Sequence, residues 1–410
     1  MSNTKPIYSA KVGWLAMLGG LFIYFTNSAC QYKVPPIMGD LCDALGMTLG
    51  QAGWLMSIMS LLGLILAIPA GFIIMKLGTR NATVLTAVIN LIGSVLGTFA
   101  TGFGLMMFSR ALEGVALGLV SVVSFQVSTA FFPAEKRGLP NACVTVAYVL
   151  SYFAMMNAAT PLNEAFGWQG LWWACNALSV IAVILAWFCI PKKANEPDFT
   201  AEENDELAAS NEKVSYKKIF TNPGLYAIAI CFVVFNIGYY GITTYMPTYL
   251  TDIVGADAGT ANFAISWNAI AGAPAALVAG FLMGKVGLRN RKWVPAIAML
   301  ALAVMYFFAF QMPNVGAAAA LLIVCGFVAS LVPPSLYTIG PDLIPKAIYA
   351  PMILAVVTFG QNLGMTLGPL VVGYTYEAFG TWSSVSIPIG VLAVIGALAM
   401  AIIKSKAKSE

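Results

Sequence analysis

Two related stretches decide the fold of this chain: GLILAIPAGFIIMKLGTRN at residues 63–81 and GAPAALVAGFLMGKVGLRN at residues 272–290. They are identical at 9 of 19 positions and start 209 residues apart (272 minus 63). The tetrapeptide EAFG also occurs twice, at 164–167 and 377–380, with Trp168 and Trp382 just beyond it. A proline, Pro36 or Pro247, closes the first apolar run on each side of the chain's centre. Matches that recur in the same order indicate a duplicated chain.

The composition excludes a soluble globular protein. Of the 410 residues, 60% are hydrophobic and 9% are charged, whereas soluble domains have about 45–50% and 25%. The seven cysteines are too sparse for a secreted disulfide scaffold. The chain has no histidine, so His metal ligands and His general bases are excluded, and we expect no metal and no cofactor. The scattered basic residues are not typical of nucleic-acid binding.

Twelve apolar runs are long enough to be membrane-spanning helices, which need about 20 residues. Because lipid offers no hydrogen bonds to the backbone, these runs must be helical. The sequence therefore predicts an all-α membrane protein in a lipid bilayer, with two pseudo-symmetric halves of six helices. The runs are 12–35, 51–75, 82–101, 105–130, 140–162, 169–190, 224–247, 260–283, 293–312, 316–339, 352–375 and 383–403.

Charge placement predicts the orientation of these spans. Only Lys33 and Arg110, among 21 Lys and Arg residues, fall outside the N-terminus, the alternate loops and the C-terminal tail. The positive-inside rule therefore places both termini in the cytoplasm of a cell, with the protein in its inner membrane. The polar segment 191–223 is predicted to be a cytoplasmic linker between an N-terminal half, 1–190, and a C-terminal half, 224–410.

The duplicated stretch carries a family resemblance. AGFIIMKLGTRN resembles the loop signature of the major facilitator superfamily, Gly-x-x-x-Asp-Arg-x-Gly-Arg-Lys, and AGFLMGKVGLRN is its second copy. RALEGVALG at 110–118 and FFPAEKRG at 131–138 are also similar to the family. The resemblance implies the twelve-helix carrier fold and a cytoplasmic gate. The matching residues are Gly71, Lys76, Gly78, Arg80, Gly280, Lys285, Gly287 and Arg289. The family's acidic position holds Met75 and Gly284.

Charged residues inside the predicted spans are the first candidates for a binding site. Lys33 and Arg110 lie on the first and fourth spans, which the resemblance places at the central cavity, and at a similar depth. Each has a rival role: Lys33 as an interfacial anchor, Arg110 as a structural partner of Glu113 at i+3. Glu113 is the carboxylate clearly within a span, so it either carries a proton or compensates Arg110.

Neutral polar residues form stripes on several spans. They either hydrogen-bond between helices or converge on a pocket with aromatic walls. Together with Lys33 and Arg110, the predicted substrate-binding residues are Tyr24, Asn27, Gln31, Tyr32, Asn236, Tyr240, Thr243, Trp267, Tyr337, Gln361 and Asn362.

The surplus of positive charge favours a secondary transporter of a small anion, and an organic carboxylate is the expected substrate. A proton or a counter-anion is the expected coupled species, and a monomer the expected state. One alternative is a proton-coupled exporter of hydrophobic drugs, and another is a membrane sensor without transport activity. No motif of an enzyme is present in the sequence.

Overall fold

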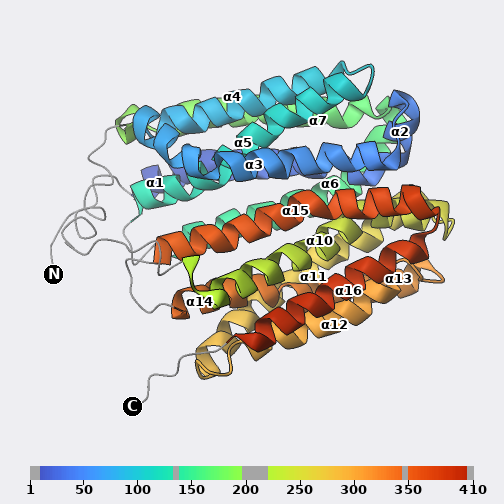
Figure 1. Ribbon diagram of the computed structural model, residues 1–410. Helices are drawn as coiled ribbons and strands as arrows, with labels where there is room; N and C mark the ends of the chain where they lie inside the picture. Colours follow the sequence, from blue (N-terminus) through green and yellow to red (C-terminus); the bar gives the residue numbers. More distant parts are fainter. Residues whose placement is uncertain (1–9, 133–137, 196–219, 344–349, 404–410) are drawn as a thin grey trace, which may run out of the picture. The chain divides into compact units, whose positions relative to one another are not determined.

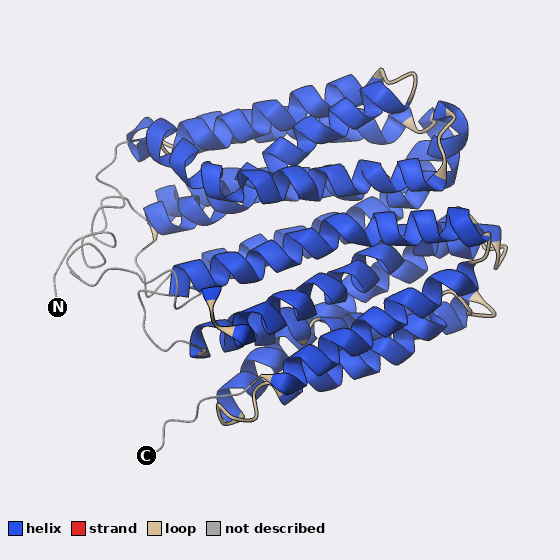
Figure 2. Ribbon diagram, viewed as in Figure 1, coloured by secondary structure: helices blue, strands red, loops and turns tan. Residues whose placement is uncertain are grey.

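The computed structural model describes residues 10–132, 138–195, 220–343 and 350–403. All regular elements in these ranges are helices (Figure 2), as the sequence predicts for a chain that must satisfy its backbone hydrogen bonds in lipid. Among the described residues, nine helices are long and apolar enough to cross a membrane, and Trp293–Ala309 is a shorter apolar helix. The linker 191–223 lies largely outside the described ranges.

The chain divides into two compact units, Met1–Met47 with Ile58–Asn211 and Thr48–Ser57 with Glu212–Glu410. The helices of the first half of the chain are α1 (Ala10–Tyr32), η1 (Pro35–Ile37), α2 (Met38–Leu45), α3 (Leu49–Leu77), α4 (Thr79–Thr98), α5 (Phe103–Phe131), α6 (Gly138–Phe166), α7 (Gln169–Cys189) and η3 (Lys192–Asn195) (Figure 1). Those of the second half are α10 (Pro223–Asp252), α11 (Ala258–Lys285), α12 (Trp293–Ala309), α13 (Val315–Ala329), α14 (Val332–Asp342), α15 (Ala350–Phe379) and α16 (Trp382–Ile402).

The twelve predicted spans correspond to α1, α3 to α7, α10 to α12, α13 with α14, α15 and α16. Two boundaries differ from the prediction. Pro36 and Pro247 were each predicted to close the first span of a half. Pro247 instead lies inside α10, which continues to Asp252. The run 316–339 is divided between α13 and α14 at Ser330, next to the pair Pro333–Pro334, because proline removes a backbone donor and favours a helix start.

Close helix contacts fix how the two halves correspond. A Cβ atom on Gly114 of α5 would lie 2.8 Å from the Cα of Met59 in α3, so only glycine fits there. In the second half, a Cβ on Gly326 of α13 would lie 3.0 Å from the Cα of Asn268 in α11. Met59 and Asn268 are related by the offset of 209 found in the sequence (268 minus 59). Gly114 and Gly326 must then correspond as well, with an offset of 212 (326 minus 114).

The recurring EAFG tetrapeptide ends a helix in each unit. Gly167 follows α6 with φ 68°, and Gly380 follows α15 with φ 67°. This left-handed conformation is accessible to glycine without steric cost, which explains why glycine ends both tetrapeptides. The duplication seen in sequence is therefore a duplication of helix-ending geometry.

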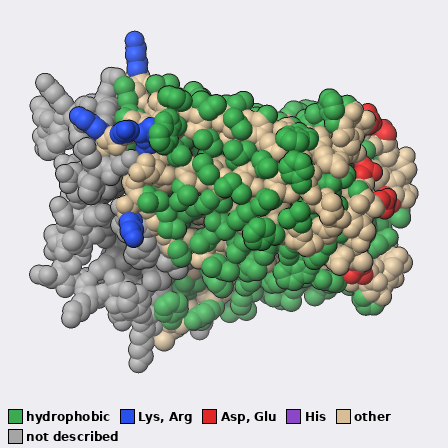
Figure 3. Space-filling view, turned by 90° about the horizontal axis from the view of Figure 1, so that it is seen from above, with side chains coloured by type: hydrophobic (Ala, Val, Ile, Leu, Met, Phe, Trp, Pro, Cys, Tyr) green, Lys and Arg blue, Asp and Glu red, His purple; other side chains and the backbone are tan. Residues whose placement is uncertain are grey.

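The outer faces of the helices are apolar, as a bilayer requires. Phe188 is 77% exposed and Ile297 is 63% exposed, and such broad apolar surface is typical of a membrane interface. On the face seen in Figure 3, Lys and Arg side chains gather at one end and Asp and Glu side chains at the opposite end. In the first unit the exposed basic residues include Lys76 and Lys192, and the exposed acidic residues include Asp40 and Glu164.

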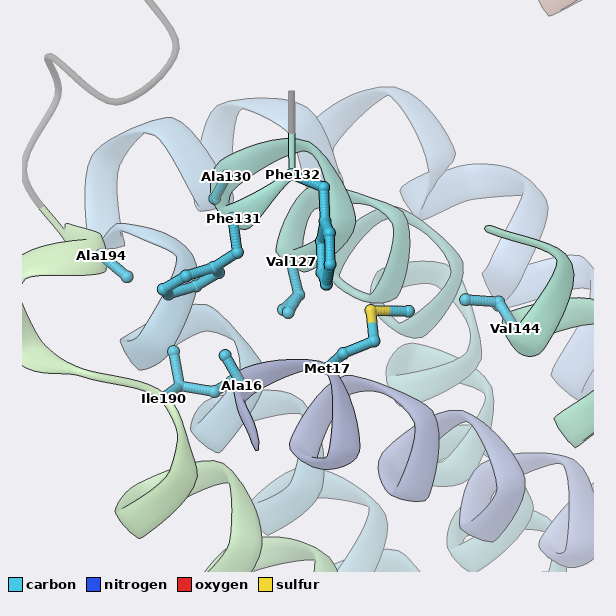
Figure 4. Close-up of a cluster of buried hydrophobic side chains, with 9 residues drawn as sticks. All are labelled: Ala16, Met17, Val127, Ala130, Phe131, Phe132, Val144, Ile190 and Ala194. Carbon is cyan, nitrogen blue, oxygen red and sulfur yellow. The ribbon is translucent and has the colours of Figure 1, made fainter. Parts of the chain in front are cut away.

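A buried apolar cluster fastens the beginning of α1 to the end of α5. Met17 of α1 lies near Val127 and Phe132 (Figure 4). Its members are Ala16, Met17, Val127, Ala130, Phe131, Phe132, Val144, Ile190 and Ala194. The same two helices are joined near the other end of α1 by polar contacts, and those contacts form the candidate site.

Candidate functional site

The site begins where α1 ends. α1 stops at Tyr32, and the chain passes through Lys33, Val34 and the short η1 helix into α2. The last four carbonyl groups of a helix have no partner within it. Arg110 of α5 donates from Nη1 to the carbonyl oxygen of Cys30 at 2.6 Å and from Nη2 to that of Gln31 at 3.1 Å. Arg110 therefore caps the end of α1, where a positive charge also interacts favourably with the negative end of the helix dipole.

Three charged side chains form a buried ion cluster at this point. Glu113 Oε2 lies 2.6 Å from Arg110 Nη1, and Glu113 Oε1 lies 2.5 Å from Lys33 Nζ. All three side chains have no solvent exposure. Two cations share one carboxylate, so the cluster has a formal charge of +1. Both the Arg110–Glu113 pair and the Lys33–Glu113 pair lie within one unit.

Besides Glu113, two uncharged groups contact Lys33. Its ammonium donates to Ser94 Oγ of α4 at 3.3 Å and lies 4.4 Å from the centre of the Trp172 ring of α7. A cation over an aromatic face is attracted by the ring quadrupole, by about 2 kcal/mol or more when desolvated. The Lys33 ammonium is thus held by α4, α5 and α7 together.

A chain of amides extends the cluster toward the middle of α1. Asn27 Nδ2 donates to Asn90 Oδ1 at 2.8 Å and to the carbonyl oxygen of Glu113 at 3.2 Å. Asn90 Nδ2 in turn donates to Ser179 Oγ of α7 at 3.0 Å. These buried hydrogen bonds connect α1, α4, α5 and α7 in the first unit. The sequence prediction included Asn27 as a binding residue, and in the structure its amide connects helices.

The second unit has no charges at the corresponding positions. With the offset of 209 for α1, Lys33 corresponds to Ile242. With the offset of 212 for α5, Arg110 corresponds to Leu322 and Glu113 to Cys325. α10 continues past Ile242 without a break, so it has no free carbonyl groups there to be capped. The ion cluster therefore belongs to the interruption that is particular to α1.

Neutral polar side chains make two pairs in the second unit. Tyr337 donates to Gln361 Oε1 at 2.7 Å, and the Tyr337 ring meets Phe232 edge-on at 5.5 Å. Tyr239 donates to Asn268 Oδ1 at 2.7 Å. Tyr337 and Gln361, both predicted from sequence, are therefore brought together.

The other predicted residues either contact a neighbouring helix or bond within their own helix. Tyr32 shares a hydrogen bond with Tyr148 of α6, and the Tyr24 ring lies 6.3 Å from the Tyr148 ring. Asn236, Thr243 and Asn362 donate to carbonyl groups of their own helices. Tyr240 packs against Tyr239, Trp267 packs against Phe263 and is 39% exposed, and the Gln31 side chain is buried.

The two copies of the loop signature differ in structure. Arg80 is buried and donates twice to the carbonyl oxygen of Trp187 near the end of α7, at 2.7 and 3.1 Å. Arg289, its partner by sequence, is exposed. In the second unit Lys292 takes this role, because it donates to the carbonyl oxygens of Ala401 and Ile403 at the end of α16.

The remaining residues of the predicted gate are mostly exposed. Lys76, Lys285 and Gly287 are exposed, and Gly78 lies between α3 and α4 with φ 77°. The helices contain Gly71 and Gly280, whose surroundings are not described. Arg291, beside the second copy, pairs with Asp342 at the end of α14 at 2.8 Å. This carboxylate comes from a helix distant in sequence and not from the signature itself.

Three residues of the cluster were not predicted from sequence: Ser94, Asn90 and Trp172. Ser94 and Asn90 lie four residues apart on α4, one turn of one helical face, which is a detectable signal. Trp172 shows no such pattern, because tryptophan near the start of a span is also typical of an interfacial anchor.

Comparison with known proteins identifies the class. The family model of the Major Facilitator Superfamily matches residues 17–352, so the chain belongs to this superfamily of transporters. It is 23% identical over 256 residues to an uncharacterized MFS-type transporter, YbcL, of Bacillus subtilis (strain 168). That match covers 62% of this chain and 60% of the relative, so it spans about three fifths of the relative's length.

Solved structures agree with this fold. A bacterial homologue of the human lysosomal transporter Spinster, in its inward-facing and occupied form, superposes with a TM-score of 0.77 at 14% identity. The unoccupied inward-facing form gives a TM-score of 0.79, also at 14% identity. Each match covers 96% of both chains. The chain therefore has the major facilitator fold, in agreement with the family model.

Proposed function

We propose that this protein is a secondary transporter of small organic carboxylates, which it moves by alternating access. The observation that carries the proposal is the surplus positive charge of the buried Lys33–Glu113–Arg110 cluster. A buried charge without a counter-charge is costly in a membrane, and charged residues inside spans are usually functional. One bound monovalent anion would neutralise the cluster.

Lys33 is the residue that provides the surplus charge. Arg110 has a structural reason for its position, because it caps α1, and Glu113 balances it. Lys33 is the third charge, and the described part of the first unit contains no second buried carboxylate beside it. The substrate carboxylate would take this place, and the Lys33 ammonium would attract it.

We also propose an orientation. The ends of the units that carry exposed Lys and Arg face the cytoplasm of a cell's inner membrane, as the positive-inside rule predicts. Lys33 follows the last residue of α1, so the ion cluster is nearer the opposite, external side. The protein would work as a monomer, with a proton or counter-anion as the coupled species.

The test is transport in liposomes. Purified full-length protein should take up or exchange radiolabelled monocarboxylates, and Lys33→Gln should weaken their binding by well over tenfold, since loss of one partner of a desolvated charge pair costs about 2–5 kcal/mol. Lys192→Gln is the matched control because Lys192 is exposed and belongs neither to the ion cluster nor to the predicted gate. Thermal unfolding of each variant checks that it is folded. Unchanged carboxylate affinity in folded Lys33→Gln protein would contradict the proposal.

The same liposomes separate the alternatives. An exporter of hydrophobic drugs would move lipophilic cations along a proton gradient and would not respond to carboxylates. A sensor would bind a ligand without net transport. Either result in wild-type protein would exclude a carboxylate transporter.

A further inference from the structure

Trp172 of α7 has a buried hydrogen-bond donor beside Lys33. The side chain has no solvent exposure, and its indole Nε1 has no hydrogen-bond partner among the described residues. An indole nitrogen can only donate. A buried donor without an acceptor is destabilising, so such a group in a native protein requires an explanation.

The indole edge of Trp172 packs tightly against Gly97 of α4. A Cβ atom on Gly97 of α4 would lie 2.3 Å from Trp172 Nε1 and 2.5 Å from Ser109 Oγ, so a larger residue at position 97 would displace the ring. The same six-helix fold does not need tryptophan here. Counted from Trp168 and Trp382, which follow the two EAFG copies 214 residues apart (382 minus 168), the position in α16 that corresponds to Trp172 is Ser386.

We propose that Trp172 Nε1 and the Lys33 ammonium together bind the carboxylate group of the substrate. This inference rests on the proposed function and names the groups that contact the anion. An anion near both would accept the unused N–H and neutralise the surplus charge, whereas a neutral acceptor would do only the first. Arg110 and Glu113 are then positioning residues, because their contacts hold α1 and Lys33 in place.

The burial of the surrounding groups limits the substrate. Lys33, Ser94, Arg110, Glu113 and Trp172 are all without solvent exposure. A single net positive charge is matched by one monovalent group. The site therefore selects a compact monocarboxylate group over a dicarboxylate, whose second charge would remain without a partner.

The decisive variant is Trp172→Phe, which keeps an aromatic face beneath Lys33, removes the N–H and replaces the two-ring indole with a smaller single ring. Equilibrium binding of radiolabelled acetate, propionate and benzoate to purified full-length protein is the measurement. We expect about tenfold weaker binding than in wild type, the loss of one charge-assisted hydrogen bond. Trp382→Phe is the matched control, because Trp382 Nε1 is also buried without a partner in the described residues, among aromatic rings of the second unit. It should leave binding within about twofold.

A second measurement uses wild-type protein, so that a folding defect cannot obscure the result. In protein with ¹⁵N-labelled tryptophan, acetate should shift one indole N–H resonance downfield, and Lys33→Gln should abolish that shift. No acetate-dependent indole shift in protein that binds acetate would overturn the inference.

The outcomes distinguish the two proposals. If wild-type protein binds none of the three probes, the carboxylate function fails and this inference fails with it. If binding depends on Lys33 but is unchanged in Trp172→Phe, only the contact with Trp172 is wrong. If Trp382→Phe weakens binding as much as Trp172→Phe, the effect is one of packing and the inference is also wrong.

Discussion

Replacing Arg110 with alanine tests whether the ion cluster is organised around the end of α1. The substitution removes the donors to the carbonyl groups of Cys30 and Gln31 and the contact with Glu113. Removing one partner from a buried ion cluster typically costs about 3–5 kcal/mol, because the remaining charge loses its compensation. Here Glu113 keeps Lys33, so we expect the lower part of that range for the charge and a further contribution from the two uncapped carbonyl groups.

Thermal unfolding of the full-length protein in detergent is the assay. Arg289→Ala serves as the control, because Arg289 is exposed and a surface substitution changes stability by about 0.5 kcal/mol at most. Arg110→Lys should recover only part of the loss, since an ammonium group cannot reproduce the planar fork that reaches two carbonyl oxygens and a carboxylate.

A triple variant provides the internal comparison. Lys33→Ile, Arg110→Leu and Glu113→Cys together install the residues of the second unit at the corresponding positions. Replacing a buried ion cluster by apolar residues is often neutral, so this variant should be more stable than Arg110→Ala and should lose carboxylate binding. If Arg110→Ala is as stable as wild type, or if the triple variant is less stable than the single one, our account of the cluster is wrong.

Three further predictions concern positions outside the ion cluster. Gly97→Ala should destabilise the protein by about 1–3 kcal/mol through overpacking, whereas Gly104→Ala, with open space around its Cβ, should not, as paired thermal unfolding would show. Lys292→Ala should lower the unfolding temperature more than Arg289→Ala, because only Lys292 donates to the end of α16. Hydrogen bonds from the side chain and the backbone N–H of Thr260 hold the pKa of Asp257 below its usual range. Its stabilisation of α11 is therefore present above the unfolded pKa, near pH 4, and is lost as pH falls through the lower folded pKa. Asp257→Asn should remove that part of the acid dependence in a pH series of unfolding temperatures.

The sequence predicted the architecture because membrane helices are encoded locally. Apolar runs of sufficient length and the duplicated stretch were enough to predict twelve helices in two related halves. The pairing of Arg110 with Glu113 was also visible as one of two readings, since residues three apart lie on the same helical face. The structure confirms this pair, whose two residues belong to the same helix, α5.

The contacts of Lys33 could not be read from the sequence in the same way. Glu113 is 80 residues away, and Ser94 is 61 residues away. Neither of the two roles predicted for Lys33 included Glu113 as its partner. Only the packing of α1 against α5 shows that one carboxylate, Glu113, is shared by two cations. The substrate role of Lys33 stays a prediction.

The loop signatures show a further limit of sequence comparison. Aligning the two copies pairs Arg80 with Arg289, yet the chain that follows the second copy is three residues longer, and the cation that meets the end of its neighbouring helix is Lys292. The offset changes from 209 before this loop to 212 after it. An insertion of three residues is small enough to leave the signature recognisable while moving the structural role to another residue.

The need to satisfy unpaired carbonyl groups explains the cations at three helix ends. Arg110 meets the end of α1, Arg80 the end of α7 and Lys292 the end of α16, and in each case the donors reach carbonyl oxygens that have no partner within the helix. In a bilayer, water cannot satisfy these groups, so a long cationic side chain from a neighbouring helix does. Lys33 is different, because its ammonium is directed to a carboxylate, a hydroxyl group and an aromatic ring. Helix capping therefore accounts for the other three cations, whereas Lys33 joins the end of α1 to side chains of α4, α5 and α7.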